Sequence, residues 1–179
     1  IGLDFGLFDR FISGSVDWYD KRTSDLIWTY PVSTTQYFVN QLTANAGEVK
    51  NTRIEVTLNA DLLRGRAFTW TTSLNLAHNK NELLSLSNDN FDLPLIYTAY
   101  LGGKGQSGNS SQVVQEGYPI GTFYTWRYAG KNADGITQIV DQAGNPTIAP
   151  SSNDFAFTGS AQPNLIYGWN NSFKYRDFD

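Results

Sequence analysis

One histidine is the residue of this chain whose type is best suited to metal binding or acid–base catalysis. His78 is the only imidazole among the 179 residues, and the chain contains no cysteine. A zinc site takes three or four such ligands, and the sequence holds neither a second imidazole nor a thiolate to complete one. By the alternation of side chains along a strand, His78 shares a face with Leu74 and Leu76. We therefore predict that His78 lies at an interface and binds no metal.

Three carboxylates could instead supply the acid–base pair of a glycoside hydrolase. Asp17, Glu55 and Asp61 each occupy the polar face of an alternating segment, and hydrolysis of a glycosidic bond uses two such groups. A polar face that meets water holds carboxylates for a simpler reason, because they are solvated there or paired with cations such as Arg53 and Lys174. We predict this second arrangement, and with it no catalytic residue and no enzymatic activity.

Two glycine-containing turns resemble ligand-binding loops only in part. Residues 132–135 (Asn-Ala-Asp-Gly) have the beginning of a calcium loop, but they lack the further acidic positions and the closing glutamate. Residues 102–105 (Gly-Gly-Lys-Gly) are rich in glycine, but their spacing is not that of a phosphate-binding loop, and no strand and helix flank them. We predict a plain turn for the first, a flexible loop for the second, and no bound cofactor.

Aromatic residues, which make up 15% of the chain, are the remaining candidates for ligand binding. One group falls on the apolar face of alternating segments, where aromatic rings mark the headgroup level of a membrane. Its members are Trp18, Trp70, Tyr167 and Trp169. A second group lies in connecting segments and could stack on a sugar, contact a protein lid or hold the loops together. Its members are Trp28, Tyr30, Tyr37, Tyr97, Tyr124 and Trp126. No individual substrate-binding residue follows from the sequence.

The elements that must position these residues are long segments in which apolar and polar side chains alternate. Every second residue from Ile54 to Leu62 is apolar, and Arg53, Glu55 and their counterparts fall between them. After the link at residues 64–66, residues 68–76 alternate in the same way. Side chains alternate with period two along a strand, so the pattern predicts a β-hairpin with one apolar and one polar face. The same pattern predicts strands over residues 2–8, 11–26 and 163–175.

The connections between these five strands are of two kinds. Short links at Asp9-Arg10 and Arg64-Gly65-Arg66, and a turn at Arg176-Asp177, fall at one end of the sheet. Long segments at about 28–47 and 87–162 fall at the other end. The longer segment contains two short strands, residues 121–129 and 135–140, which the turn at 132–135 joins. Short turns at one end and long loops at the other are typical of an outer-membrane β-barrel, although a soluble sandwich also alternates apolar and polar residues.

Composition excludes several other classes of protein. A net charge of −4 provides no basic surplus for nucleic acid. No run of about 18 apolar residues is present that would form a transmembrane helix. The chain begins with Ile1 rather than methionine and shows no signal peptide, so we expect it to be a fragment of a longer protein.

Five tracts of the sequence, in order, resemble the SusC/RagA-type TonB-dependent transporters of Bacteroidetes. They are VDWYDKRTSDLI, NAGEVKNTRIEVTLNADLL, SLNLAHNKNELLSL, EGYPIGTFYTWRYAGKNADG and GSAQPNLIYGWNNSFKYRDFD. Together they cover nearly the whole chain. At Thr52-Arg53 the family usually has a basic residue followed by glycine, which leaves a local turn or bulge at that point open.

The resemblance implies an all-β fold, namely an antiparallel section of a large transmembrane β-barrel of about 22 strands. It implies five principal strands plus an extracellular hairpin, with residues 1–179 forming part of the barrel domain and the plug domain and TonB box absent from this chain. It also implies import of glycan or peptide fragments across the outer membrane, a SusD-like surface lipoprotein as partner, and TonB as the source of energy. A passive porin-type barrel and a secreted β-sandwich that binds carbohydrate stay open as alternatives.

Overall fold

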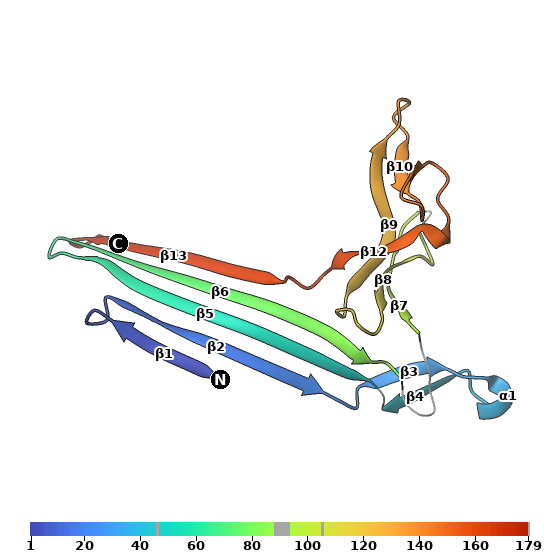
Figure 1. Ribbon diagram of the computed structural model, residues 1–179, viewed down its shortest axis with the longest axis horizontal. Helices are drawn as coiled ribbons and strands as arrows, with labels where there is room; N and C mark the ends of the chain where they lie inside the picture. The colour runs from blue at the N-terminus through green and yellow to red at the C-terminus, as the bar shows by residue number, and fades with distance from the viewer. Residues whose placement is uncertain (46, 88–93, 105, 179) are drawn as a thin grey trace. The chain divides into compact units, whose positions relative to one another are not determined.

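The computed structural model describes residues 1–45, 47–87, 94–104 and 106–178, and nearly all of its regular structure is antiparallel β-sheet (Figure 1). The described residues divide into two compact units. The first unit contains residues 1–22, 50–81 and 163–178, and the second contains residues 23–49 and 82–162. No helix in the described ranges is long and apolar enough to span a membrane.

The first unit is a single five-stranded sheet made of the strands that the alternating pattern predicts. Its order is β1-β2-β5-β6-β13. The strands are β1 (Gly2–Leu7), β2 (Ile12–Thr23), β5 (Glu48–Arg64), β6 (Phe68–Ser85) and β13 (Leu165–Tyr175). β5 runs through Thr52 and Arg53 without interruption, so no turn replaces the glycine that the family usually has there. The prediction of five principal antiparallel strands is confirmed.

The register of the sheet places apolar and polar side chains on opposite faces. In the β6–β13 pair, Leu74 lies opposite Trp169 and Trp70 lies opposite Phe173, while Ser73 between them lies opposite Asn170. Because directly opposed residues of an antiparallel pair share a face, one face carries the aromatic and aliphatic side chains. The other carries hydroxyl and amide groups, as the period-two pattern predicts.

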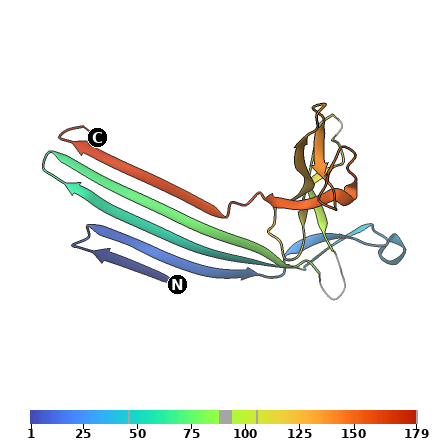
Figure 2. The ribbon, with the colours of Figure 1, turned by 45° about the horizontal axis from the view of Figure 1, so that its top comes forward.

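Three turns lie at the same end of this sheet (Figure 1 and Figure 2). The turn between β1 and β2 takes the four residues 8–11 rather than the two-residue link at Asp9-Arg10, because Leu7 pairs with Ile12. Phe8, Asp9 and Arg10 all have φ between 52° and 65°, a conformation that the alternating pattern does not reveal. The turn at Arg176-Asp177 is confirmed by the paired backbone bonds between Tyr175 and Phe178.

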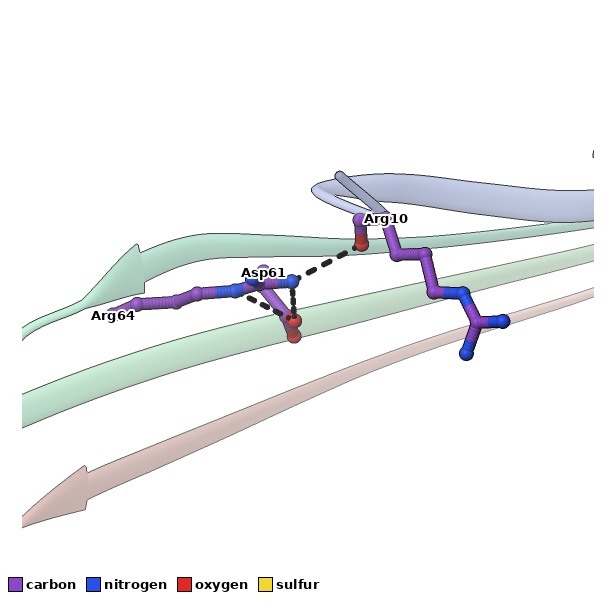
Figure 3. Close-up of polar contacts among 3 residues, drawn as sticks. All are labelled: Arg10, Asp61 and Arg64. Carbon is purple, nitrogen blue, oxygen red and sulfur yellow. Dashed lines mark hydrogen bonds and ion pairs between the residues drawn. The ribbon is translucent and has the colours of Figure 1, made fainter. Parts of the chain in front are cut away.

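A cluster around Arg64 fastens two of these turns together (Figure 3). The Arg64 Nη2 group donates to the Asp61 carboxylate at 2.6 Å and to the Arg10 carbonyl at 3.1 Å. The backbone N–H of Asp61 donates to the carbonyl of Phe11 at 3.0 Å. The cation that pairs with Asp61 is therefore Arg64, rather than Arg53 or Lys174. Since both side chains are exposed to solvent, the pair contributes on the order of 1 kcal/mol or less.

The segment at about 28–47, which the sequence predicts only as a loop, contains regular structure. Strands β3 (Ile27–Pro31) and β4 (Gln41–Asn45) pair in antiparallel register, and the short helix α1 (Thr34–Tyr37) lies between them. Phe38 ends the helix with φ 55°. The alternation of apolar and polar residues does not predict this hairpin, because each strand has only five residues and the pattern is too short to be recognised.

The segment at about 87–162 builds a six-stranded sheet in the order β11-β10-β9-β8-β7, with β12 paired to β9. Its elements are β7 (Ile96–Tyr100), β8 (Ser110–Val114), β9 (Thr122–Lys131), β10 (Thr137–Val140), β11 (Pro146–Thr147), the 3-10 turn η1 (Ser152–Asp154) and β12 (Phe155–Ser160). The predicted strands at 121–129 and 135–140 correspond to β9 and β10, which pair as expected. β7, β8 and β12 are additional.

The buried core lies in the second unit. Val49, Leu83, Leu86 and Val114 form one apolar cluster, against which Trp28 and other partly buried side chains pack. In the described part of the first unit, Ala77 is the one apolar residue that counts as buried. A sheet with so little buried apolar surface of its own gains little stability from a core.

Candidate ligand-binding site

A row of aromatic rings covers one face of β9 and β12. Register pairs Phe155 with Trp126 and Phe157 with Tyr124, and period-two alternation places all four rings on the same side. The Tyr124 and Phe157 ring centroids are 5.1 Å apart, and those of Trp126 and Phe155 are 5.3 Å apart. Tyr118 extends the row by stacking on Phe157 at 4.0 Å. Such pairs each add about 0.5–1.5 kcal/mol beyond burial, so the row is a fixed surface.

Two tyrosines of β7 face the same space, although they are three positions apart. Residues separated by three positions lie on opposite faces of a regular strand. Between Tyr97 and Tyr100, however, Ala99 has φ 52°, in the left-handed region that costs a residue with a Cβ about 1–2 kcal/mol. The carbonyl of Ala99 accepts a hydrogen bond from the Ser111 hydroxyl at 3.1 Å. This local departure from the strand lets both rings line one cavity.

The cavity has a volume of about 510 Å³ and opens to solvent. We call it the tyrosine cavity. Its aromatic lining consists of Tyr97, Tyr100, Tyr124 and Phe155. Its polar lining consists of the amide side chains Asn109, Gln142 and Asn153 with the hydroxyls Ser110 and Ser152. The volume lies in the range of small-molecule pockets, which combine apolar walls with a few polar groups that fix orientation.

The Asp154 carboxylate holds one wall of the tyrosine cavity in place. It accepts hydrogen bonds from the Ser151 backbone at 2.7 Å, the Ser151 hydroxyl at 3.0 Å and the Gln142 backbone at 3.1 Å. The Gln142 side chain donates to the Asn153 carbonyl at 2.7 Å. The bonds from Ser151, followed by that from Gln142, hold the pKa of Asp154 below its usual range because they favour the charged form. The wall that carries Gln142 and Asn153 is thus pre-organised.

The structure separates the six loop-side aromatic residues into binding candidates and structural residues. Tyr97 and Tyr124 line the tyrosine cavity, and Trp126 lies beside it, with its ring tilted by 49° against that of Phe155. Tyr30 is only 1% exposed, and burial raises the pKa of its phenol. Trp28 packs on the core cluster, and Tyr37 lies in α1. The sequence gives no signal for Tyr100, because its place in the cavity depends on the backbone at Ala99.

His78 and Glu55, which the sequence offers as candidates for metal binding or catalysis, have neighbours that indicate a structural role. His78 lies opposite Leu165 on the apolar face, as predicted. Glu55 forms an ion pair with Arg53, also as predicted. Across the described ranges of the chain, no three residues of His, Cys, Asp or Glu are grouped as a metal site would require.

The two glycine-containing turns connect strands. The side-chain oxygen of Asn132 accepts from the backbone N–H groups of Asp134 at 3.0 Å and Ile136 at 2.8 Å, which confirms a plain turn at residues 132–135. Residues 102–104 belong to the connection between the antiparallel strands β7 and β8, so they do not sit between a strand and a helix. Gly105 lies outside the described residues.

On the apolar face of the five-stranded sheet, the indole groups of β6 and β13 have partners within the sheet. Trp169 donates its N–H to the Thr72 hydroxyl at 2.9 Å, and Trp70 donates to the Asn171 side-chain oxygen at 3.1 Å. Thr72 and Asn171 lie directly opposite each other and are the polar residues of an otherwise apolar stretch. Internal pairing of this kind is what a surface facing hydrocarbon requires, since no water is available there.

An antiparallel sheet with one apolar and one polar face, and with its short turns at one end, is typical of a section of a membrane-barrel wall. Sequence comparisons give the family. TonB-dependent receptor SusC of Bacteroides thetaiotaomicron is 31% identical over 183 residues, which cover 99% of this chain and 18% of that protein. TonB-dependent receptor P3 of Formosa agariphila is 29% identical over 195 residues, covering 100% of this chain and 19% of that protein. No family model matches the chain.

A solved structure gives the same fold. The structure of the RagAB peptide transporter superposes with a TM-score of 0.75 at 24% identity, over 98% of this chain and 19% of that one. The chain spans about a fifth of the length of the curated relatives it matches. It belongs to the SusC/RagA-type TonB-dependent transporters and corresponds to a section of their β-barrel.

Proposed function

We propose that this chain forms part of the wall and the extracellular loops of an outer-membrane TonB-dependent transporter that imports glycan or peptide fragments. The five-stranded sheet contacts outer-membrane lipid on its apolar face. The segments at about 28–47 and 87–162 are extracellular loops of the barrel domain. A SusD-like surface lipoprotein covers the complete transporter, and TonB drives it through a plug region outside this chain. No bond in the cargo is broken, so the protein is not an enzyme.

The height of the apolar face is the observation that carries this proposal. Along β6 this face extends from Phe68 to His78, ten residue steps that span roughly 34 Å at about 3.4 Å each. A strand tilt of about 40° reduces this length to a height of roughly 26 Å. The apolar band of an outer-membrane barrel is about 25 Å tall. The face therefore matches the hydrocarbon layer in extent as well as in composition.

The opposite face suits a water-filled lumen. Thr57 donates to the side-chain oxygen of Asn75 at 3.1 Å, and Asn81 donates to that of Asn51 at 2.7 Å. Together with the Arg53–Glu55 ion pair, these bonds form a line of uncharged and charged polar contacts across β5 and β6. Polar groups of this density favour contact with water rather than with a second apolar layer.

The same observations disfavour the secreted β-sandwich. In a sandwich the apolar face would be buried against a second sheet, but Ile54 is 44% exposed and Trp169 is 71% exposed. Val56, Leu58, Trp70 and Leu74 are partly exposed as well. Apolar exposure on this scale marks a surface that another medium or partner covers.

Uptake by whole cells with and without TonB distinguishes the proposal from a passive porin. Cells that produce the full-length protein are supplied with labelled glycan and peptide fragments. We expect uptake of at least one fragment, and its loss when TonB is removed. A passive pore would take up the fragment equally in both strains, and that result would overturn energised transport.

A further inference from the structure

We propose that the tyrosine cavity binds an uncharged saccharide, with a sugar ring lying against Tyr100 and Tyr97. The inference rests on the proposed function, because it names the cargo class that these loops recognise. Neither the sequence pattern nor the relatives assign a ligand to this cavity.

The tyrosine rings of β7 offer open apolar surface rather than core packing. Tyr97 is 47% exposed and Tyr100 is 67% exposed, in contrast to the 1% of the structural Tyr30. Tyrosine provides a large, rigid contact area at little cost in conformational entropy. The C–H face of a pyranose ring is flat and apolar, and it fits such a surface. The strained backbone at Ala99, which brings both rings to one side, is the kind of local strain that binding sites retain.

The polar lining matches hydroxyl groups. A sugar hydroxyl both donates and accepts, and the amide side chains of Asn109, Gln142 and Asn153 do the same at a single position. Ser110 and Ser152 add hydroxyls of their own. The Asp154 carboxylate fixes the wall carrying two of these amides through bonds of 2.7 to 3.1 Å. A pre-organised lining loses less entropy when the ligand binds.

The lack of charged side chains in the described part of the cavity lining favours a saccharide over a peptide as the ligand. None of the described residues that line the tyrosine cavity carries a charge, and the nearby Asp154 carboxylate is occupied by Ser151 and Gln142. A peptide brings charged termini, and an acidic sugar brings carboxylates. Charges placed in this cavity would lose water without gaining a counter-ion, which is unfavourable. The cavity therefore selects uncharged saccharides.

Equilibrium binding to the purified full-length protein in detergent tests the inference. The uncharged probes are maltohexaose, cellohexaose, xylohexaose, mannohexaose and laminarihexaose, and the charged probes are hexagalacturonic acid and hexaalanine. We expect calorimetry to detect binding of at least one uncharged probe and weaker binding of both charged ones. Binding of none of the five uncharged probes, or tighter binding of a charged one, would overturn the inference.

A matched pair of variants locates the site. Tyr100→Ala should weaken binding of the active probe about tenfold, as loss of a central aromatic contact does. Tyr128→Ala is the control, because Tyr128 is 66% exposed and lies on β9 of the same unit without lining the cavity. It should leave affinity unchanged. Equal affinities for Tyr100→Ala and the unaltered protein would place the sugar elsewhere and reject the cavity.

The outcome is independent of the test of transport. Binding in detergent requires neither TonB nor a membrane. TonB-independent uptake together with saccharide binding would reject energised transport and leave the cavity assignment standing. TonB-dependent uptake without saccharide binding would reject the cavity assignment alone.

Discussion

Tyr30 in β3 donates its phenolic hydrogen to the carbonyl oxygen of Leu86 at 2.9 Å, which joins positions 56 residues apart in the sequence. Both residues are buried, at 1% and 0% exposure, and Leu86 belongs to the core cluster with Leu83. A buried carbonyl without its donor costs about 1–3 kcal/mol. This hydrogen bond therefore ties the β3–β4 hairpin to the core of the second unit.

Tyr30→Phe should lower the local stability of the second unit by about 1–3 kcal/mol, because the ring is kept and only the hydrogen bond is lost. Hydrogen exchange of the full-length protein, followed at the backbone amide of Leu83, measures this change. Tyr128→Phe is the control, since its hydroxyl belongs to an exposed side chain. Identical exchange in the unaltered protein and Tyr30→Phe would show that the bond contributes nothing.

Substitution by alanine should lower the stability of the protein much more at Gly14 than at Gly168, two glycines of the five-stranded sheet. A Cβ at Gly14 would lie 2.1 Å from the carbonyl oxygen of Thr57, whereas a Cβ at Gly168 would meet nothing within 4 Å. The clash at Gly14 is with backbone, so β2 and β5 would have to separate, at a cost of about 1–3 kcal/mol or more. Gly168→Ala should change stability by less than about 1 kcal/mol. Urea titration of both full-length variants in detergent measures the difference, and similar midpoints would contradict it.

The five strands of the first unit follow from the sequence because one local rule reveals them. Alternation with period two fixes their faces, and the short turn at Arg64-Gly65-Arg66 makes β5 and β6 neighbours. The four-residue turn at residues 8–11 was harder to predict, since its left-handed residues Phe8, Asp9 and Arg10 are not glycines. A positive φ is predicted from sequence mainly where glycine or asparagine occurs.

The second unit is much less predictable from the sequence. β9 and β10 stand out because the turn at residues 132–135 separates two alternating runs. β7, β8 and the β3–β4 hairpin have only five residues in each strand, and their partners are chosen by tertiary packing. The tyrosine cavity depends on that packing and on the conformation of Ala99. Sequence therefore names Tyr97 and Tyr124 as candidates, but it cannot show that they meet Tyr100.

Arginine substitutions on the two faces of β6 should have unequal effects. Leu74 lies near the middle of the apolar face, and Leu74→Arg should cost about 2–4 kcal/mol in the membrane-inserted barrel. Leu58→Arg on β5 should behave in the same way. Ser73→Arg, one residue away on the polar face, should be tolerated because its side chain meets water. The fraction of full-length protein that reaches the outer membrane in folded form measures both, and equal losses would contradict the assignment of the faces.

The hydrogen bonds that the Asp154 carboxylate accepts from Ser151 and Gln142 should make the stability of residues 141–154 sensitive to acid. Because the pKa of Asp154 is lowered in the folded protein, its contribution is present at pH values above its ordinary pKa of about 4 and is lost as pH falls through the lowered value. Proteolysis of this segment in the full-length protein should therefore be slow and constant from about pH 8 to pH 5, and should accelerate only below about pH 4.

Asp154→Asn should remove this dependence on pH and make the segment susceptible to proteolysis at neutral pH, because the carboxylate that accepts from Ser151 and Gln142 is gone. Asp141, which accepts from the Asn145 backbone at 2.7 Å, is present in both proteins, so the difference between them isolates Asp154. Asp134→Asn, in the neighbouring turn, is the matched control and should behave like the unaltered protein. An acid transition that persists in Asp154→Asn would assign it to another group.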